Sequence, residues 1–361
     1  MSQLELKALS KRFGAHKVFD GIDLNVSSGE IVVIFGGSGT GKTILLRLIA
    51  GVEEPSGGSI EIGGMDVLDV APEHRGVGMA FQNFALFPHM SAHENIATPL
   101  RARNATAEAV KAGVEKVAKL LKISHVLDHA PRELSNGQKQ RTALARALAA
   151  EPEILLLDDP LRNVDAKLRF EMRLELPRLL RQSGATVLYV TQDYKEAMAL
   201  GDRIAVLAGG RFEQIATPQD IYERPASLNV AKLFGDPAIN TAETAVEVNG
   251  NTVNVTLGGM KVAIGRAYRT LDGRAVTFAV RPEAVEVILA KGIGLAATVM
   301  AVTPLNERTV LLLKSNGGWE FLASLPSSTH AVPEPGANVR AAFAADGVHM
   351  FDRETGVRLD G

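Results

Sequence analysis

Eight consecutive residues of this chain have the composition of a phosphate-binding loop. The segment 36–43 reads GGSGTGKT and matches the pattern G-x-x-x-x-G-K-[ST]. Glycines at these places let backbone N–H groups turn inward onto a polyphosphate. Lys42 can reach the β- and γ-phosphates, and the Thr43 hydroxyl can take a position on Mg²⁺. The residues of the predicted loop are Gly36, Gly37, Ser38, Gly39, Thr40, Gly41, Lys42 and Thr43.

Such a loop needs a strand before it and a helix after it. The apolar run 31–35 (IVVIF) predicts the strand, and 44–50 (ILLRLIA) predicts the helix, whose N-terminus adds a positive dipole end. A chance glycine turn is the alternative, and the agreement of pattern and context argues against it. We therefore expect the chain to bind a nucleoside triphosphate.

Composition narrows the remaining functions. A length of 361 residues suggests two domains, and a net charge of -2 gives no basic field for nucleic acid. With no cysteine, disulfides and thiolate metal sites are excluded. No apolar signal core and no run of 18 apolar residues occur, so we expect a soluble chain that does not itself cross a membrane.

The pattern of apolar and polar residues changes near residue 235. Over 1–235, apolar strands alternate with helical patterns, which predicts an α/β domain with a mostly helical part at about 84–153. Pro177 lies inside one helical pattern and is expected to kink or end it. Over 236–361, short alternating runs separated by turn signals predict a small all-β barrel or sandwich.

Four further motifs follow the loop in order. Gln82 follows the strand 77–81, the segment 134–138 (LSNGQ) opens a helix, 154–159 (ILLLDD) ends in two carboxylates, and Gln192 follows the strand 187–191. Together these motifs resemble the ATP-binding subunit of an ABC transporter over about the first 235 residues.

Other segments resemble the maltose-type branch of importer ATPases: 73–79, 85–90, 165–169 and 280–283 (VRPE). This resemblance implies a P-loop NTPase fold with a helical subdomain and a C-terminal OB-like (TOBE) domain that holds the ATPase dimer together. It implies uptake of a carbohydrate or polyol, with glycerol as one candidate. Polyamine and inorganic-ion importers are the nearest rivals.

The resemblance implies ATP and Mg²⁺ as cofactors. Phe13 would stack on adenine, although an ordinary core phenylalanine is the alternative reading. Gln82 would contact Mg²⁺ and the attacking water, and Asp158 would hold Mg²⁺ through water. Asp159 and Gln192 would occupy the catalytic positions.

The resemblance also implies a dimer in which ATP is sandwiched between two chains. The γ-phosphate on the opposite subunit would be contacted by the signature loop, Ser135, Asn136, Gly137 and Gln138, and Asp165 would couple the two sites. The region 83–95, expected to be helical, would dock a coupling helix of the membrane subunit, or its apolar side chains would simply pack internally. The expected partners are a second ATPase subunit, two integral membrane permease subunits and, indirectly, a solute-binding protein. The expected location is the cytoplasmic face of the inner or plasma membrane.

Four positions depart from the family pattern. Asp159 stands in place of glutamate, Gln192 in place of histidine, Asn136 in place of glycine and Arg162 in place of serine. Asp159 is one methylene, about 1.5 Å, too short, and Gln192 cannot carry a positive charge. We favour pairing with a paralogue that carries Glu and His. A slow homodimeric ATPase and a regulatory ATP-binding module remain alternatives.

Overall fold

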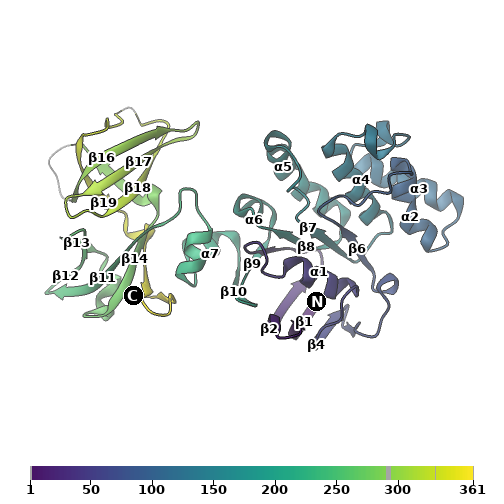
Figure 1. Ribbon diagram of the computed structural model, residues 1–361, viewed down its shortest axis with the longest axis horizontal. Coiled ribbons are helices and arrows are strands. Elements are labelled where there is room, and N and C mark those ends of the chain that lie inside the picture. Colours follow the sequence, from purple (N-terminus) through teal and green to yellow (C-terminus); the bar gives the residue numbers. More distant parts are fainter. Residues whose placement is uncertain (1, 290–293, 330, 361) are drawn as a thin grey trace. The chain divides into compact units, whose positions relative to one another are not determined.

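The computed structural model describes residues 2–289, 294–329 and 331–360 (Figure 1). Its two compact units divide between Pro218 and Gln219. The segment 219–233 therefore belongs to the second unit by its contacts. The domain boundary at 235/236 that the sequence predicts rests on resemblance to the family rather than on contacts within the fold. It stays a prediction.

A mostly parallel six-stranded sheet forms the centre of the first unit (Figure 1). Neighbouring strands follow the order β10-β9-β3-β8-β7-β6. All residues of β3, β7 and β8 are buried, which explains their uninterrupted apolar sequences. Because the carboxyl ends of parallel strands meet at one edge, the residues after β3, β6, β7 and β8 come together there. The strands are β3 (Ile31–Phe35), β6 (Val77–Ala80), β7 (Ile154–Asp158), β8 (Thr186–Thr191), β9 (Arg203–Ala208) and β10 (Arg211–Ala216).

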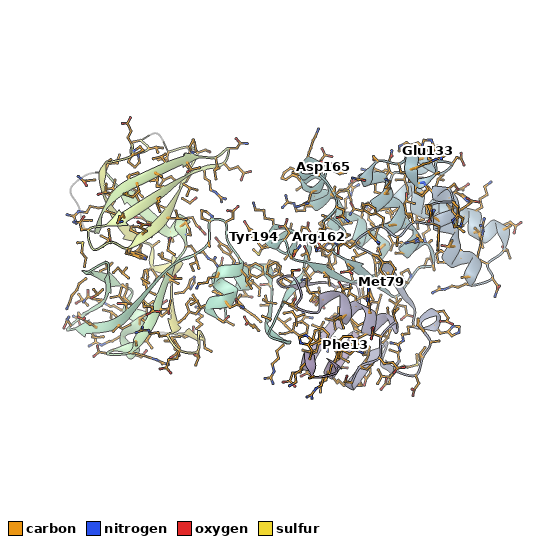
Figure 2. All side chains as sticks on the ribbon, in the orientation of Figure 1. Phe13, Met79, Glu133, Arg162, Asp165 and Tyr194 are labelled. Carbon is orange, nitrogen blue, oxygen red and sulfur yellow. The ribbon has the colours of Figure 1, made fainter. Side chains whose placement is uncertain are left out.

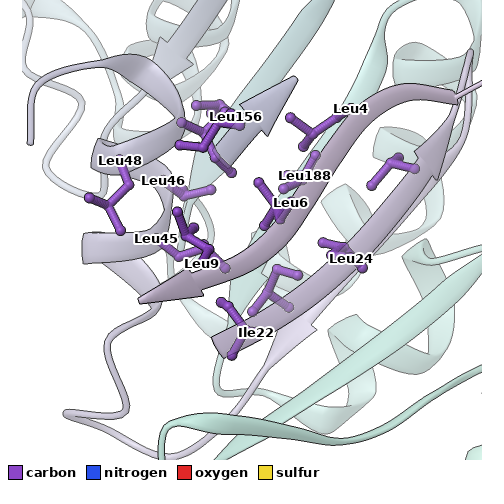
Figure 3. Packing of buried hydrophobic residues seen from close by; sticks show 14 of the residues in the cluster. Leu4, Leu6, Leu9, Ile22, Leu24, Leu45, Leu46, Leu48, Leu156 and Leu188 are labelled. Atoms are coloured by element: carbon purple, nitrogen blue, oxygen red, sulfur yellow. The ribbon is translucent and has the colours of Figure 1, made fainter. Parts of the chain in front are cut away.

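An antiparallel sheet of order β2-β1-β4-β5 completes this part of the unit. A single core cluster joins its side chains to those of α1 (Lys42–Ala50) and of the parallel sheet. Figure 3 shows Leu6 and Leu9 facing Leu45 and Leu46 of α1. The helix behind the glycine loop is thus fixed by packing. The strands are β1 (Ser2–Phe13), β2 (His16–Ser27), β4 (Gly57–Ile62) and β5 (Met65–Asp66).

Helices make up the rest of the first unit. Three of them, α2, α3 and α4, lie in the region where helix was expected. Residues 81–91 form turns and irregular chain, so the prediction of helix over 83–95 is wrong for the residues before Ala92. Pro177 does not end its helix, because burial of Met172, Leu176 and Leu180 offsets one missing hydrogen bond. The helices are α2 (Ala92–Ala102), α3 (Ala107–Leu120), α4 (Asn136–Ala149), α5 (Ala166–Ser183) and α6 (Tyr194–Leu200). Among the described residues, no helix is both long and apolar enough to span a membrane.

The second unit begins with two short helices and continues as antiparallel sheet, which confirms the predicted all-β fold. Its sheets follow the orders β13-β12-β11-β14-β20-β21 and β15-β19-β16-β17-β18, and they share one hydrophobic core. Trp319 stacks on Phe321 there, with ring centres 4.4 Å apart.

The elements of the second unit are α7 (Pro218–Glu223), α8 (Leu228–Leu233), β11 (Asn240–Asn249), β12 (Thr252–Leu257), β13 (Met260–Ile264), β14 (Ala275–Val280), β15 (Val285–Ile288), β16 (Leu295–Pro304), β17 (Arg308–Ser315), β18 (Glu320–Pro326), β19 (Asn338–Phe343), β20 (Val348–Asp352) and β21 (Arg358–Leu359).

Candidate nucleotide-binding site

The glycine loop lies between β3 and α1, and packing requires two of its glycines. Gly41 has a φ of +96°, and a side-chain carbon there would lie 2.6 Å from Cγ1 of Val18. At Gly36 such a carbon would lie 2.5 Å from the main-chain oxygen of Leu207. Neither position can take a larger residue unless its neighbours move. The loop is therefore shaped by β2 and β9 as well as by its own sequence.

The ammonium group of Lys42 folds back onto this loop. Its Nζ donates hydrogen bonds of 2.8 Å to the carbonyl of Gly36 and 2.7 Å to that of Gly37. Burial lowers the pKa of Lys42, while Asp159 and Asp158 act in the opposite direction. Charged phosphate oxygens are stronger acceptors than neutral carbonyls. When a polyphosphate enters, Lys42 can therefore exchange the two carbonyl oxygens for phosphate oxygens.

Thr43 and Asp158 bring two oxygen ligands together. The Thr43 hydroxyl donates a 3.0 Å hydrogen bond to Oδ1 of Asp158 at the end of β7. Burial raises the pKa of Asp158, and this hydrogen bond opposes the rise. Mg²⁺ binds through one or two carboxylates plus substrate phosphates, so this oxygen pair fits that ion. Within the described residues no cluster of three or more His, Cys, Asp or Glu forms a metal site, which is compatible with such a sparse ligand set.

The adjacent carboxylate, Asp159, has a strained backbone. Its φ is +43°, and its N–H donates a 2.9 Å hydrogen bond to the carbonyl of Val190 in β8. Burial raises the pKa of Asp159, and the guanidinium of Arg162 acts against that rise. Nη1 of Arg162 lies 3.7 Å from Oδ2 of Asp159.

One cavity of about 220 Å³ is lined by part of the phosphate loop together with the residues that follow β6, β7 and β8. It contains the catalytic and metal positions expected from the sequence, although their functional roles stay predictions. Its lining residues are Ser38, Gly39, Gly41, Lys42, Thr43, Ile44, Gln82, Asp158, Asp159, Arg162, Val190 and Gln192.

Phe13 does not line this cavity. It lies at the end of β1 with 46% of its surface exposed, and Nζ of Lys11 lies 4.6 Å from the centre of its ring (Figure 2). This exposure shows that Phe13 is not an ordinary core residue. Stacking on adenine stays a prediction.

The signature loop also lies outside the cavity. Ser135 and Gln138 cap α4 reciprocally: the Ser135 Oγ accepts from the Gln138 N–H at 3.3 Å, and Oε1 of Gln138 accepts from the Ser135 N–H at 2.9 Å. Asn136 is helical and has no positive φ, so the change from glycine needs no left-handed backbone. Gly137 is constrained, because a side-chain carbon there would lie 2.6 Å from Cδ2 of Leu168.

Asp165 and its neighbours stabilise the loop that precedes α5. Asp165 caps α5 by accepting a 3.0 Å hydrogen bond from the Leu168 N–H (Figure 2). Nδ2 of Asn163 donates a 3.0 Å hydrogen bond to the carbonyl of Gln82. No local pattern predicts this last contact, because the two residues lie 81 positions apart.

Arg146 of α4 fixes the segment that follows Gln82. It donates hydrogen bonds of 2.6 Å to the carbonyl of Ala85 and 3.0 Å to that of Phe84, both of which have positive φ. A groove of about 1090 Å³ lies here, with Phe81, Ala85, Phe87, Met90 and Arg146 among its lining residues.

A buried carboxylate that sequence reasoning missed lies behind β8. Oε2 of Glu196 accepts 2.9 Å hydrogen bonds from the hydroxyls of Tyr189 and Thr191. Burial raises the pKa of Glu196 to about 7, although both hydrogen bonds act against the rise. A tyrosine within an otherwise apolar strand was the available signal, since a buried phenol needs a partner.

A strand, a glycine loop, a helix and a second parallel strand of the same sheet that ends in a buried carboxylate define a P-loop nucleoside triphosphatase. Residues 19–162 match the family described as ABC transporter, and residues 278–351 match the TOBE domain. The sulfoquinovosyl glycerol transport ATP-binding protein SmoE of Agrobacterium fabrum is 39% identical, with 98% of this chain and 99% of that protein covered.

Two further relatives are similar along their whole length. The alpha-glucoside transport ATP-binding protein AglK of Rhizobium meliloti is 40% identical, with 98% of each chain covered. The sn-glycerol-3-phosphate import ATP-binding protein UgpC of Escherichia coli is 38% identical, with 99% of this chain and 100% of that protein covered.

Among solved structures, a bacterial ABC transporter cassette determined as a dimer is 30% identical with a TM-score of 0.54, covering 60% of this chain and 98% of its own. The protein cbiO1 from Clostridium perfringens is 25% identical with a TM-score of 0.56, covering 61% of this chain and 90% of its own. The chain belongs to the ABC transporter family of ATP-hydrolysing subunits and carries a C-terminal TOBE domain. The predicted family and fold class are confirmed.

Proposed function

We propose that this chain is the ATP-binding subunit of an importer for a carbohydrate or polyol. The observation that carries the proposal is the cavity in which Lys42, Thr43 and Asp158 converge. The names of SmoE, AglK and UgpC refer to a sulfoquinovosyl glycerol, an alpha-glucoside and a glycerol phosphate, which supports a sugar-like solute.

In this proposal Lys42 leaves its loop carbonyls for the β- and γ-phosphates, and Thr43, Asp158 and Gln82 would hold Mg²⁺. The ion would supply positive charge that neutralises the phosphates. Asp159 orients the attacking water and accepts its proton, and Gln192 donates a hydrogen bond to the γ-phosphate. Both act less effectively than the Glu and His of the family pattern, because the first is short and the second carries no charge.

The weakened pair belongs to the chain's own site, whereas the signature loop, residues 134–138, serves the site of the opposite subunit. A partner ATPase chain with Glu and His would therefore hydrolyse ATP in a site that this chain completes. In a mixed dimer, changing the partner's catalytic glutamate to glutamine should abolish turnover, while Asp159→Asn should change it less than twofold. Equal losses from both changes would contradict the asymmetric arrangement.

The groove beside Arg146 is the proposed docking surface for a helix of the permease. Its apolar side chains, Phe81, Phe87 and Met90, suit an amphipathic helix. Gln82, which follows Phe81 in the chain, lines the nucleotide cavity. Binding there would place the chain at the cytoplasmic face of the membrane, with two permease subunits and, through them, a solute-binding protein. Co-purification with two integral membrane subunits tests this. Met90→Asp should abolish it, and tight ATP binding without any membrane partner would favour the regulatory reading.

A further inference from the structure

Arg162 places a second cation in the nucleotide cavity beside Lys42. Its side chain is 47% exposed, and in the described part of the chain its ion-pair partner is Asp159, at 3.7 Å. This separation exceeds a hydrogen bond, so the contact is a loose one, although Asp159 itself is buried. The guanidinium can therefore exchange Asp159 for a partner that offers it direct hydrogen bonds.

The backbone that carries Arg162 is fixed on both sides. Nη2 of Arg169 donates 3.1 Å hydrogen bonds to the carbonyls of Arg162 and Val164. Asn163 is attached to the carbonyl of Gln82, and the N–H of Arg162 donates a 3.2 Å hydrogen bond to the carbonyl of Asp159. With the main chain held, the long side chain lines the cavity. Arg162 is labelled in Figure 2.

A terminal phosphate is a better hydrogen-bond acceptor for Arg162 than Asp159 is. Several oxygens with more than one negative charge suit the planar guanidinium fork, which binds phosphate through paired hydrogen bonds. Gln192, in the same cavity, adds no charge, so Lys42 and Arg162 are the two cations among the described residues that line it. The γ-phosphate distinguishes ATP from ADP, so a cation at the catalytic end of the cavity, next to Asp159, would sense that group.

Resting on the proposed function, we propose that Arg162 is a γ-phosphate-binding residue that discriminates ATP from ADP in the chain's own site. When Arg162 binds the γ-phosphate, its ion pair with Asp159 opens. Asp159 is then free to interact with the attacking water. The binding is non-covalent, and the proton and charge count of the hydrolysis itself is unchanged.

The test measures binding of MgATP and MgADP to the purified full-length chain by calorimetry. Arg162→Ser should weaken ATP binding on the order of tenfold (about 1.4 kcal/mol) and ADP binding less than about twofold, because only ATP loses a charge-assisted hydrogen bond. Arg162→Lys should fall between. The matched control is Arg178→Ser on the exposed side of α5, which removes the same charge outside the cavity and should alter neither affinity.

A double-mutant cycle with Asp159→Asn tests the opening of the ion pair. This change should strengthen ATP binding severalfold more in the wild type than in Arg162→Ser, because only the former has a guanidinium to release. Equal loss of ATP and ADP affinity in Arg162→Ser, or an additive cycle, would overturn the inference alone. A wild-type chain that binds neither nucleotide would overturn it together with the proposed function.

Discussion

The hydroxyl of Thr43 donates a 3.0 Å hydrogen bond to Oδ1 of Asp158, which connects the start of α1 to the end of β7. These residues lie 115 positions apart, and they meet because β3 and β7 both pair with β8 in parallel. The pair joins the phosphate loop to the carboxylate edge of the sheet. Its oxygens are the ones that the proposal assigns to Mg²⁺.

Asp158→Asn should remove the magnesium dependence of ATP binding. An amide keeps the shape and can still accept from Thr43, but it carries no charge for a divalent cation. We expect MgATP affinity to fall on the order of tenfold or more, while affinity in EDTA changes little. Calorimetry with and without Mg²⁺ measures this. An unchanged ratio of ATP affinity with Mg²⁺ to ATP affinity in EDTA would show that Asp158 does not bind the magnesium ion.

Gly41→Ala should destabilise the first unit even without nucleotide. The new carbon would meet Val18 at 2.6 Å with φ at +96°, and such strain costs about 1–3 kcal/mol. The control is Gly37→Ala, because a carbon at Gly37 meets nothing within 4 Å. Urea unfolding followed by circular dichroism should show a loss for Gly41→Ala and a change within about 0.5 kcal/mol for Gly37→Ala. Equal effects would mean that packing does not shape the loop.

Glu196 should make the first unit less stable as the pH rises. Its folded pKa, about 7, lies above the ordinary value of 4.5, so the native state binds the proton more tightly than the unfolded chain. The stabilisation is complete below pH 4.5 and is lost as the pH rises towards 7, by roughly 3 kcal/mol at about 1.4 kcal/mol per unit.

Glu196→Gln isolates this effect, since glutamine resembles the protonated acid. The difference in unfolding free energy between wild type and variant should favour the variant progressively from pH 5 to pH 8. A difference that stays constant over that range would show that Glu196 titrates normally.

Arg281 should contribute strongly to the stability of the second unit. Its buried guanidinium donates to the carbonyls of Tyr222, Ala231 and Phe234 and lies 3.9 Å from the centre of the Tyr222 ring. Arg281→Met leaves these carbonyls without that donor, at a cost of roughly 3 kcal/mol or more.

The matched control for Arg281→Met is Arg274→Met, which breaks a half-exposed ion pair with Asp352 and should cost about 1 kcal/mol or less. Trp319 is the single tryptophan of the sequence and lies in the second unit, so its fluorescence reports unfolding there. Similar losses for both variants would show that Arg281 is an ordinary surface charge.

The contiguous parts of the site could be predicted from sequence. The loop 36–43 and the carboxylates 158–159 each carry their signal within a few residues, and the strands beside them are apolar throughout. Contacts set by topology could not be predicted, such as Asn163 with Gln82 or Arg146 with Phe84. The expectation that Pro177 could end its helix was wrong because burial of the neighbouring side chains outweighs a local backbone preference. The sequence could not show whether Phe13 is buried, because an aromatic residue at the end of a strand can face the core or the solvent.

In the function proposed above, this chain binds ATP well and hydrolyses it poorly in its own site. The most direct measurement is steady-state ATP turnover of the purified chain alone, compared with the double variant Asp159→Glu with Gln192→His. We expect slow turnover for the wild type and a rise on the order of 100-fold in the variant, at similar ATP affinity. Brisk wild-type turnover that the double variant does not increase would contradict it.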